Sequence, residues 1–311
     1  MRLRLVAILF PVLNRHPAGC LFFRVLIPGA QCAIMRISMT GEGRIMGNYL
    51  VTGACGGMGT AICRMLAENH HRVWGIDRSP DARPEAQGIT VLSADLTDPD
   101  ALRSAAERIG QEAGSLDGIV HTAGIYDLNS LVEMPEEEFV RDFDVNLFAV
   151  FRVNRLFVPL LEPGGRVVMI SSELAPLRPM PFTGIYAVTK TAVEQYAMAL
   201  RMELQLLGHR VVVIRPGAVK TNMLPASTAK LDRFCEQTAL YRCNADRFRR
   251  IVNRVEARHV PPERIARTVK EALTAKRPKL TYCVNRNPLL LLYGALPARV
   301  QLWAIKKILE E

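Results

Sequence analysis

The sequence has no closely spaced cysteines. Its 311 residues include seven cysteines, and no two of them have the C-x-x-C spacing typical of zinc sites and redox motifs. Without such a pattern we expect neither a bound metal nor a disulfide framework. Scattered cysteines of this kind fit a reducing cytoplasm, which is the expected compartment.

Long uncharged apolar runs are missing as well. Residues 5–13 look at first like the apolar region of a signal peptide, but the chain is interrupted at Arg15, Arg24 and Arg36. A spanning helix needs about 20 predominantly apolar residues. We therefore expect no transmembrane segment.

The chain also lacks internal repeats, low-complexity segments and any aromatic–basic motif. Its formal net charge is +10, but residues 1–45 hold six Arg and one Glu, so about half of that charge belongs to this segment. A nucleic-acid binder is suggested by charge alone, and the uneven distribution of charge weakens that reading. Composition is otherwise that of an ordinary globular protein with one large core, for which a single domain is the prior expectation.

What the chain does contain is a glycine-rich segment directly after an apolar run. Tyr49-Leu50-Val51 is followed by Thr-Gly-Ala-Cys-Gly-Gly-Met-Gly at residues 52–59. Such a turn lets the backbone approach a pyrophosphate and directs the N–H groups of the following helix towards it. The segment predicts a dinucleotide site, although similar glycine clusters also form ordinary tight turns.

A second motif, Tyr186-Ala-Val-Thr-Lys190, lies far along the chain. On a helix, residues four apart share one face, so the ammonium of Lys190 can lower the pKa of the Tyr186 phenol. Tyr186 could then act as an acid or base nearer to neutral pH. Together the two motifs predict hydride transfer between a nicotinamide and an alcohol or ketone.

The apolar runs between these motifs predict the fold class. Short β-branched segments bounded by turn residues alternate with helical stretches of ten or more residues. The predicted strands are 71–76, 89–93, 116–121, 165–171 and 210–214, and the first predicted helix is 60–69. This alternation indicates an α/β fold with a parallel sheet covered on both faces.

From about Asn48 to about Tyr282 the chain resembles the short-chain dehydrogenase/reductase family, because several separate motifs occur in the family's order. The loop matches the family's Thr-Gly-x-x-x-Gly-x-Gly and also the Thr-Gly-x-x-Gly-x-x-Gly of sugar-epimerising relatives. His121-Thr-Ala-Gly124 stands where the dehydrogenase branch has Asn-Asn-Ala-Gly, and its first two positions depart from that pattern. The resemblance implies a seven-stranded, doubly wound Rossmann sheet in a domain spanning residues 46–285.

The resemblance also implies the cofactor, which is NAD, with NADP as the alternative. Asp77 ends the second strand, where an acidic side chain binds the ribose and repels a 2′-phosphate, whereas the adjacent Arg78 could contact a phosphate. Asp95 and Leu96 resemble the family's adenine contact. The expected cofactor residues are Gly53, Gly57, Met58, Gly59, Asp77, Arg78, Asp95, Leu96, Ala123, Gly124, Asn146, Tyr186, Lys190, Pro216, Gly217, Val219 and Thr221.

The catalytic set implied by the resemblance is Asn146, Ser172, Tyr186 and Lys190, with Ser171 as the alternative serine. Ser172 would bind the substrate oxygen and Tyr186 would move the proton. Lys190 would lower the pKa of the tyrosine and bind the nicotinamide ribose. Asn146 would hold a water beside the lysine, although an asparagine facing solvent is the ordinary alternative.

Substrate and partners are predicted from the apolar segments. The family resemblance implies a lid at residues 222–260, and the arginines of this segment form either a solvated helix face or a site for an anionic substrate tail. Residues 286–311 should form an apolar helical tail, similar to the hydroxysteroid and retinol dehydrogenases, which packs on the core or a partner subunit in preference to a membrane. These features favour an apolar secondary alcohol such as a hydroxysteroid, bile acid or retinoid.

Two other functions remain open at this stage, a 3-oxoacyl-type ketoreductase and a non-catalytic dinucleotide sensor of the same fold. The family analogy implies a homodimer or homotetramer. Because the dinucleotide strand begins almost at the start of such chains, we expect residues 1–45 to be a leader that is disordered or not translated.

Overall fold

The computed structural model describes residues 10–11, 20–25, 33–38, 46–79, 84, 86–221, 223–256 and 258–310, and its contacts divide them into two units. The first unit, residues 1–47, contains an antiparallel sheet of three strands, which are β1 (Phe10–Pro11), β2 (Cys20–Val25) and β3 (Ala33–Ser38). The second unit, residues 48–311, carries all the motifs described above. That residues 1–45 are a leader stays a prediction.

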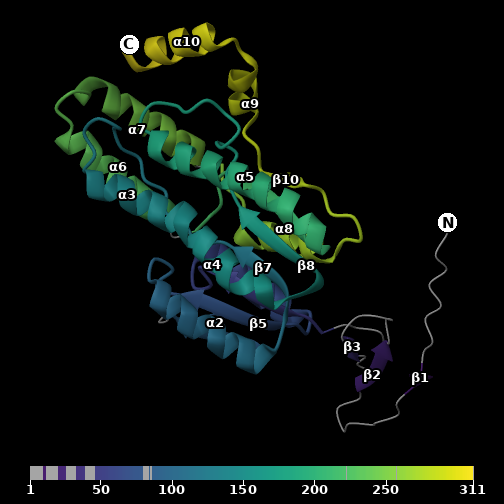
Figure 1. Ribbon diagram of the computed structural model, residues 1–311. Coiled ribbons are helices and arrows are strands. Elements are labelled where there is room, and N and C mark those ends of the chain that lie inside the picture. Colours follow the sequence, from purple (N-terminus) through teal and green to yellow (C-terminus); the bar gives the residue numbers. More distant parts are fainter. Residues whose placement is uncertain are drawn as a thin grey trace. The chain divides into compact units, whose positions relative to one another are not determined.

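A seven-stranded sheet forms the centre of the second unit (Figure 1). All of its strands are parallel, and their order is β10-β9-β8-β7-β4-β5-β6. The strands are β4 (Asn48–Thr52), β5 (Arg72–Asp77), β6 (Ile89–Ser93), β7 (Leu116–His121), β8 (Leu161–Ile170), β9 (Arg210–Pro216) and β10 (Thr281–Val284). The predicted doubly wound Rossmann sheet is confirmed.

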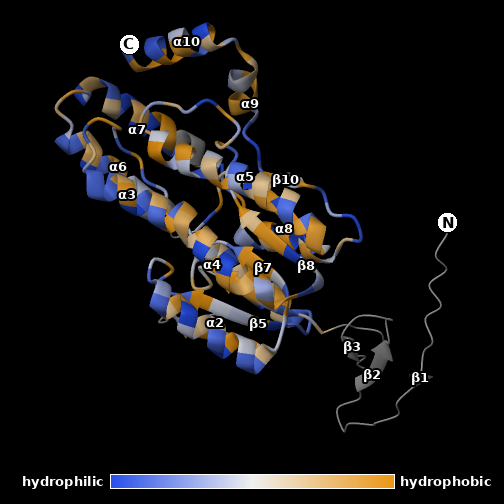
Figure 2. Cartoon of the chain, viewed as in Figure 1, coloured by the Kyte–Doolittle hydropathy of each residue, from blue (hydrophilic) through white to orange (hydrophobic). Residues whose placement is uncertain are grey.

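Helices follow the strands and cover the two faces of the sheet. They are α1 (Gly57–Glu68), α2 (Pro99–Ala113), α3 (Glu136–Phe143), α4 (Ala149–Phe157), α5 (Gly184–Leu204), α6 (Met223–Gln237), α7 (Arg242–Glu256), α8 (Pro262–Thr274), α9 (Pro288–Ala295) and α10 (Ala298–Glu310). Short helices η2 (Asp144–Phe148), η3 (Val158–Leu160) and η4 (Gln205–Leu207) extend α3, α4 and α5. Hydrophobic and hydrophilic residues alternate along most of them (Figure 2).

Two apolar cores hold the helices against the sheet. On one face, Ile62 and Leu66 of α1 and Val269 of α8 pack against apolar side chains of the strands. On the other face, residues of α2, α4 and α5 form the second core, which includes the fully buried Phe157. Successive side chains of a strand point to opposite faces of the sheet, so every central strand contributes apolar side chains to both cores. This explains the nearly continuous apolar sequence of these strands.

The predicted strands agree closely with the observed ones. Residues 89–93 and 116–121 are the bounds of β6 and β7, whereas β8 begins at Leu161, earlier than the predicted residue 165. Leu116 of β7 pairs with Leu161 of β8, and Gly118 pairs with Arg166, so the register shifts between these two pairs. The polar segment Glu162-Pro-Gly-Gly165 of β8 lies within this shift. That segment reads as a turn in the sequence, which explains the late predicted start.

Among the described residues, no helix combines the length and the apolar character that crossing a bilayer requires.

A buried polar pair lies at the end of β7. His121 Nε2 is 2.9 Å from Asn154 Oδ1 of α4, and both side chains are almost fully buried. Burial lowers the pKa of His121 to about 4, because the charged imidazolium would lose its hydration. Burial thus favours the neutral imidazole, and the bond with Asn154 offsets only part of the lowering.

We expect this pair to make the fold sensitive to acid. Unfolded His121 binds a proton below about pH 6.5, whereas folded His121 does so only below about pH 4, so the free energy of unfolding falls across this window. His121→Asn cannot titrate at this position. Its free energy of unfolding, measured with urea, should therefore fall by about 2 kcal/mol less than that of the wild type when the pH is lowered from about 7.5 to about 5. An equal loss in both proteins would contradict this assignment.

Candidate active site

The glycine loop joins β4 to α1 at the carboxyl edge of the sheet. Gly53 has φ +68°, a left-handed conformation that favours glycine, and its N–H donates to Ile76 O at 2.8 Å. A Cβ on Gly59 would lie 2.0 Å from Gly53 O, and one on Gly57 would lie 2.8 Å from Thr221 Cγ2. Glycine is therefore required at 53, 57 and 59, which is the dehydrogenase spacing.

The start of α1 is suited to an anion. Gly56 caps the helix without a side-chain hydrogen bond, and the first turn holds no acidic residue. The N–H groups at this end are consequently available to a phosphate. The close-packed glycines and the uncapped helix end together fit a dinucleotide pyrophosphate.

A cavity of about 310 Å³ extends from this loop along the ends of β5, β6 and β7. Asp77 accepts N–H groups from Cys55 at 3.0 Å and from Ser79 at 3.0 Å, so its carboxylate is fixed between the glycine loop and its own turn. The lining includes eleven of the expected cofactor residues: Gly53, Gly57, Met58, Gly59, Asp77, Arg78, Asp95, Leu96, Ala123, Gly124 and Thr221.

Asp95 also forms a local turn. Its Oδ1 accepts the backbone N–H of Thr97 at 2.8 Å and the Thr97 hydroxyl at 2.7 Å. The backbone bond is the largest cause of the lowered pKa of this carboxyl. Asp95 thus lines the cavity while its carboxylate stabilises the turn after β6.

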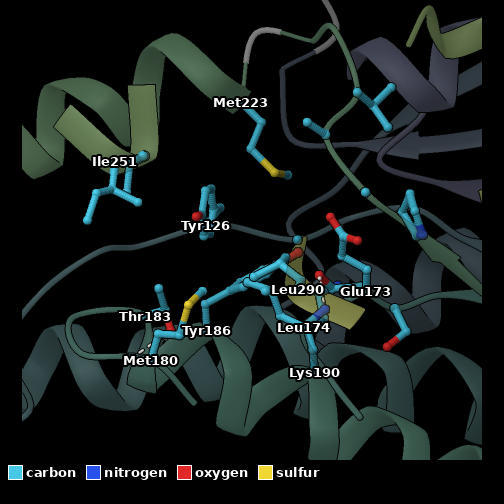
Figure 3. A pocket seen from close by; sticks show the side chains of 18 of the residues that line it. Tyr126, Glu173, Leu174, Met180, Thr183, Tyr186, Lys190, Met223, Ile251 and Leu290 are labelled. Carbon is cyan, nitrogen blue, oxygen red and sulfur yellow. Dashed lines mark hydrogen bonds between the residues drawn. The ribbon is translucent and has the colours of Figure 1, made fainter. Parts of the chain in front are cut away.

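A second cavity, of about 190 Å³, adjoins the first and shares residues such as Met58, Tyr126 and Thr221 with it. Tyr186 and Lys190 reach it from α5, and Met223 and Ile251 lie across from them (Figure 3). Its walls are mainly apolar and include Met180, Pro181, Phe248, Val252, Leu290, Ile305, Ile308 and Leu309. Of the expected cofactor residues, Tyr186, Lys190, Pro216, Gly217 and Val219 line this cavity.

The Tyr186 hydroxyl is at the polar end of the apolar cavity. It forms a hydrogen bond with Ser172, and its ring contacts the Tyr126 ring at a centroid distance of 4.5 Å. Burial raises the pKa of Tyr186 to about 12, and the bond with Ser172 opposes the rise. The phenol is therefore protonated at neutral pH and can donate a proton.

Lys190 lies close to Tyr186, and that it lowers the pKa of the phenol stays a prediction, because burial is the largest influence on that pKa here. Its Nζ lies 5.7 Å from the Tyr186 ring centroid and donates to Ile170 O at 3.1 Å. Burial lowers the pKa of Lys190 to about 8. Because this value lies below the pKa of Tyr186, Lys190 is already neutral at the pH where the phenol titrates, so it does not offset the desolvation of the phenol there.

The two serines after β8 have different partners. The Ser171 hydroxyl donates to Glu194 Oε1 at 2.8 Å, and Glu194 also binds the Arg215 guanidinium, whose Nε lies 2.7 Å from Oε1. Ser172 instead faces Tyr186 and accepts the Leu174 N–H at 3.2 Å. The geometry favours Ser172 over Ser171 for contact with a substrate.

Asn146 is the one expected site residue that lines neither cavity. It is buried within the π-helical turn η2, where its amide exchanges hydrogen bonds with the backbone of Ile125 at 2.8 and 3.0 Å and donates to Thr189 Oγ1 at 3.1 Å. A Cβ on Gly124 would lie 3.1 Å from Asn146 Oδ1 and 3.3 Å from Lys190 Nζ. Asn146 therefore faces the lysine side of the site and not solvent.

The two departures from the family pattern after β7 are explained by their bonds. Thr122 Oγ1 donates to Thr52 O at 2.6 Å and so joins the ends of β7 and β4, while His121 bonds to Asn154 as described above. Both positions stabilise the strand ends through partners that the sequence pattern does not identify.

Helix α6 and the residues after it are held against the core by polar contacts that no motif predicts, and the lid at 222–260 stays a prediction. Lys230 of α6 binds Asp127, which follows β7 and also accepts from Arg141 at 2.6 Å. Glu133 accepts the Thr238 hydroxyl at 2.6 Å at the other end of α6. Lys230 and Asp127 both border the nucleotide cavity, so α6 forms part of its wall.

The arginines of residues 222–260 are not part of the described cavity walls. The walls take the apolar residues Phe248, Ile251 and Val252 from α7, whereas Arg249 pairs with Asp232 at 3.2 Å and Asp246 at 2.8 Å. For the exposed Arg233, Arg242 and Arg250 the geometry favours a solvated helix face, whereas Nη1 of Arg247 is buried.

The chain was compared with known proteins. The family model for short chain dehydrogenases matches residues 48–232. The 3-ketodihydrosphingosine reductase of Bacteroides thetaiotaomicron is 26% identical over 74% of this chain and 84% of its own length. The NADPH-dependent 3-dehydrocapnine reductase of Ornithobacterium rhinotracheale is 30% identical over 78% of this chain and 89% of its own.

Among solved structures, a short chain dehydrogenase from Burkholderia cenocepacia J2315 in complex with NADP is similar, with a TM-score of 0.64 and 26% identity. The match covers 78% of this chain and 97% of that one.

The close packing of the loop gives a direct test of the nucleotide cavity. Gly59→Ala should weaken the binding of an adenine dinucleotide at least tenfold in calorimetry, because its Cβ forces Gly53 O out of the loop. The matched control is Gly110→Ala in α2, where a Cβ has ordinary contacts of 3.7 Å or more. Unchanged affinity in Gly59→Ala would exclude this loop as the pyrophosphate site.

Proposed function

The chain belongs to the short-chain dehydrogenase family and is an NAD(P)-dependent oxidoreductase; on this basis we propose that it reduces a ketone on a long apolar substrate to a secondary alcohol. One observation carries the proposal, namely that the Tyr186–Ser172 hydroxyl pair closes an apolar cavity that adjoins the nucleotide cavity. The pair supplies proton chemistry at the point where the two cavities meet.

Each residue of the site has a separate role in the proposed reaction. The bound nicotinamide supplies or accepts the hydride. Ser172 donates a hydrogen bond to the substrate oxygen, and Tyr186 gives that oxygen its proton in reduction or removes it in oxidation. Lys190 lies at the polar end of the cavity and passes the replacement proton to Tyr186, and Asn146 lies behind it on the lysine side of the site. A phenol that is protonated at neutral pH suits the reductive direction.

The relatives support a ketone of a long-chain lipid over a hydroxysteroid, bile acid or retinoid. Both named reductases act on 3-keto or 3-dehydro compounds, and dihydrosphingosine is a long-chain base. The apolar lining from α7, α9 and α10 suits such a chain, as it would suit a steroid. The complete Ser172, Tyr186 and Lys190 set supports an enzyme over a dinucleotide sensor.

The cofactor preference is a further part of the proposal. Asp77 lies at the end of β5 in the nucleotide cavity, where its charge would bind ribose hydroxyls and repel a 2′-phosphate. We therefore favour NAD(H) for this chain, with NADP(H) as the alternative that Arg78 and the relatives support.

We also expect a homodimer or homotetramer. Five large apolar side chains on η2, α4 and α5 are exposed by 40% or more: Phe148, Phe151, Val188, Met198 and Met202. An apolar helix face of this kind is typical of a subunit contact. It lies on the elements that carry Asn146 and Tyr186, as the family analogy implies.

The role of Tyr186 is tested by removing its hydroxyl. Tyr186→Phe should lower ketone reduction about 1000-fold, since proton transfer by a placed side chain contributes 10²–10⁴-fold, while nucleotide affinity changes less than about twofold. Turnover is followed through absorbance of the reduced nicotinamide with long-chain 3-ketones and hydroxysteroids. Ser171→Ala is the matched control and should retain most activity, and comparable turnover in Tyr186→Phe would refute the mechanism.

The charge of Asp77 is tested with an isosteric variant. Asp77→Asn keeps an acceptor for the Cys55 N–H but removes the charge, so it should raise kcat/KM for NADPH relative to NADH about tenfold. Asp95→Asn should leave this ratio unchanged, because that carboxylate is engaged by Thr97. A wild type that strongly prefers NADPH, with no change in Asp77→Asn, would overturn the assignment.

A further inference from the structure

Helices α9 and α10 expose an unusual number of large apolar side chains. Leu289 and Leu292 of α9 are 64% and 66% exposed, and Leu302 and Trp303 of α10 are 73% and 63% exposed. These four residues are called the tail surface below. In α9, seven of the eight residues are apolar or aromatic and none is buried, so the helix is apolar on every side (Figure 2).

Other side chains of the same two helices form the wall of the substrate cavity. Leu290 of α9 and Ile305, Ile308 and Leu309 of α10 line it. Ile308 is also 53% exposed, so the cavity wall reaches the outside of the protein at this point. An apolar surface therefore continues from the interior of the cavity to the tail surface.

Three basic residues are the helical neighbours of Trp303. Arg299, Lys306 and Lys307 stand four before, three after and four after it on α10, and are therefore its neighbours on the helix. All three are exposed, and the acidic residue of α10, Glu310, lies 3.5 Å from Lys306. Tryptophan among lysine and arginine is the pattern of a helix that lies in the interface of an anionic membrane.

The base of the tail is fixed to the active site. Glu173, the residue after Ser172, accepts the Asn287 N–H at 2.7 Å just before α9. The Asn285 side chain donates to Ala218 O at 2.9 Å and to Arg258 O at 3.0 Å. The position of α9 is thus set by the cofactor loop and by the end of β8.

We propose that the tail surface docks on an anionic lipid bilayer and that the substrate cavity opens towards the bilayer at this surface. The apolar residues enter the headgroup region, and Arg299, Lys306 and Lys307 meet the lipid phosphates. At 8 and 13 residues, α9 and α10 are too short to cross the bilayer, so they lie on it.

A second copy of the chain fits this surface less well. In a symmetric contact the same patch meets itself, so the three basic residues around Trp303 of each copy would face those of the other, and within α10 each copy offers Glu310 to offset them. An anionic membrane offers the complementary charge. Docking itself does not depend on the reaction, whereas the entry of a lipid into the cavity rests on the proposed function.

The test is co-sedimentation of the full chain with vesicles. We expect strong binding to phosphatidylcholine vesicles containing about one quarter phosphatidylglycerol, and weak binding to phosphatidylcholine alone or in high salt. Each of Arg299→Gln and Lys307→Gln should weaken binding about fivefold, and Trp303→Ala should weaken it at least as much. The controls are Arg64→Gln on α1, which removes an exposed basic residue, and Leu206→Ala on η4, which removes a side chain that is 83% exposed.

Equal binding of the wild type and the tail variants, or no binding to anionic vesicles, would overturn the proposal. So would an oligomer that dissociates on Trp303→Ala in sedimentation velocity, because the tail surface would then be a contact between subunits. Turnover of a short water-soluble ketone is measured in parallel and should be the same in wild type and variants. If neither this ketone nor long-chain 3-ketones and hydroxysteroids are turned over while vesicle binding persists, the proposed function fails and the docking surface stands.

Discussion

The parallel pairing of the central strands is the constraint on which the site depends. Because all seven strands run in one direction, their carboxyl ends meet at one edge, and the connections that leave them supply the site. The glycine loop follows β4, Asp77 ends β5, Thr122 follows β7, Ser172 follows β8 and Gly217 follows β9. The strand direction alone therefore brings residues that are far apart in the sequence to the same edge of the sheet.

Burial then sets the protonation of the convergent groups. The same desolvation raises the pKa of Tyr186 to about 12 and lowers that of Lys190 to about 8, since each group is disfavoured in its charged form. A neutral phenol beside a weakly basic lysine is a proton donor with a replacement proton close by. The same burial in the apolar site therefore strengthens the preference of Tyr186 for its protonated form.

The sequence was most informative where one local pattern determines one local structure. The glycine loop, the bounds of β6 and β7, and the Tyr186–Lys190 face of α5 follow from turn chemistry, β-branched runs and helical spacing. The choice of Ser172 over Ser171 could not be made in this way, because it depends on Glu194, on α5, and Arg215, on β9. The Lys230–Asp127 pair and the aromatic contact of Tyr126 were missed for the same reason, since distant parts of the chain create them.

The central claim is that hydride passes between a nicotinamide and a lipid carbon in the cavity between Tyr186 and α10. The most direct measurement uses reduced nicotinamide dinucleotide carrying deuterium at both C4 positions, a long-chain 3-ketone and mass spectrometry of the product. The account predicts a secondary alcohol with one deuterium on the carbinol carbon. An alcohol without deuterium, or tight nucleotide binding with no alcohol formed from any ketone, would contradict it.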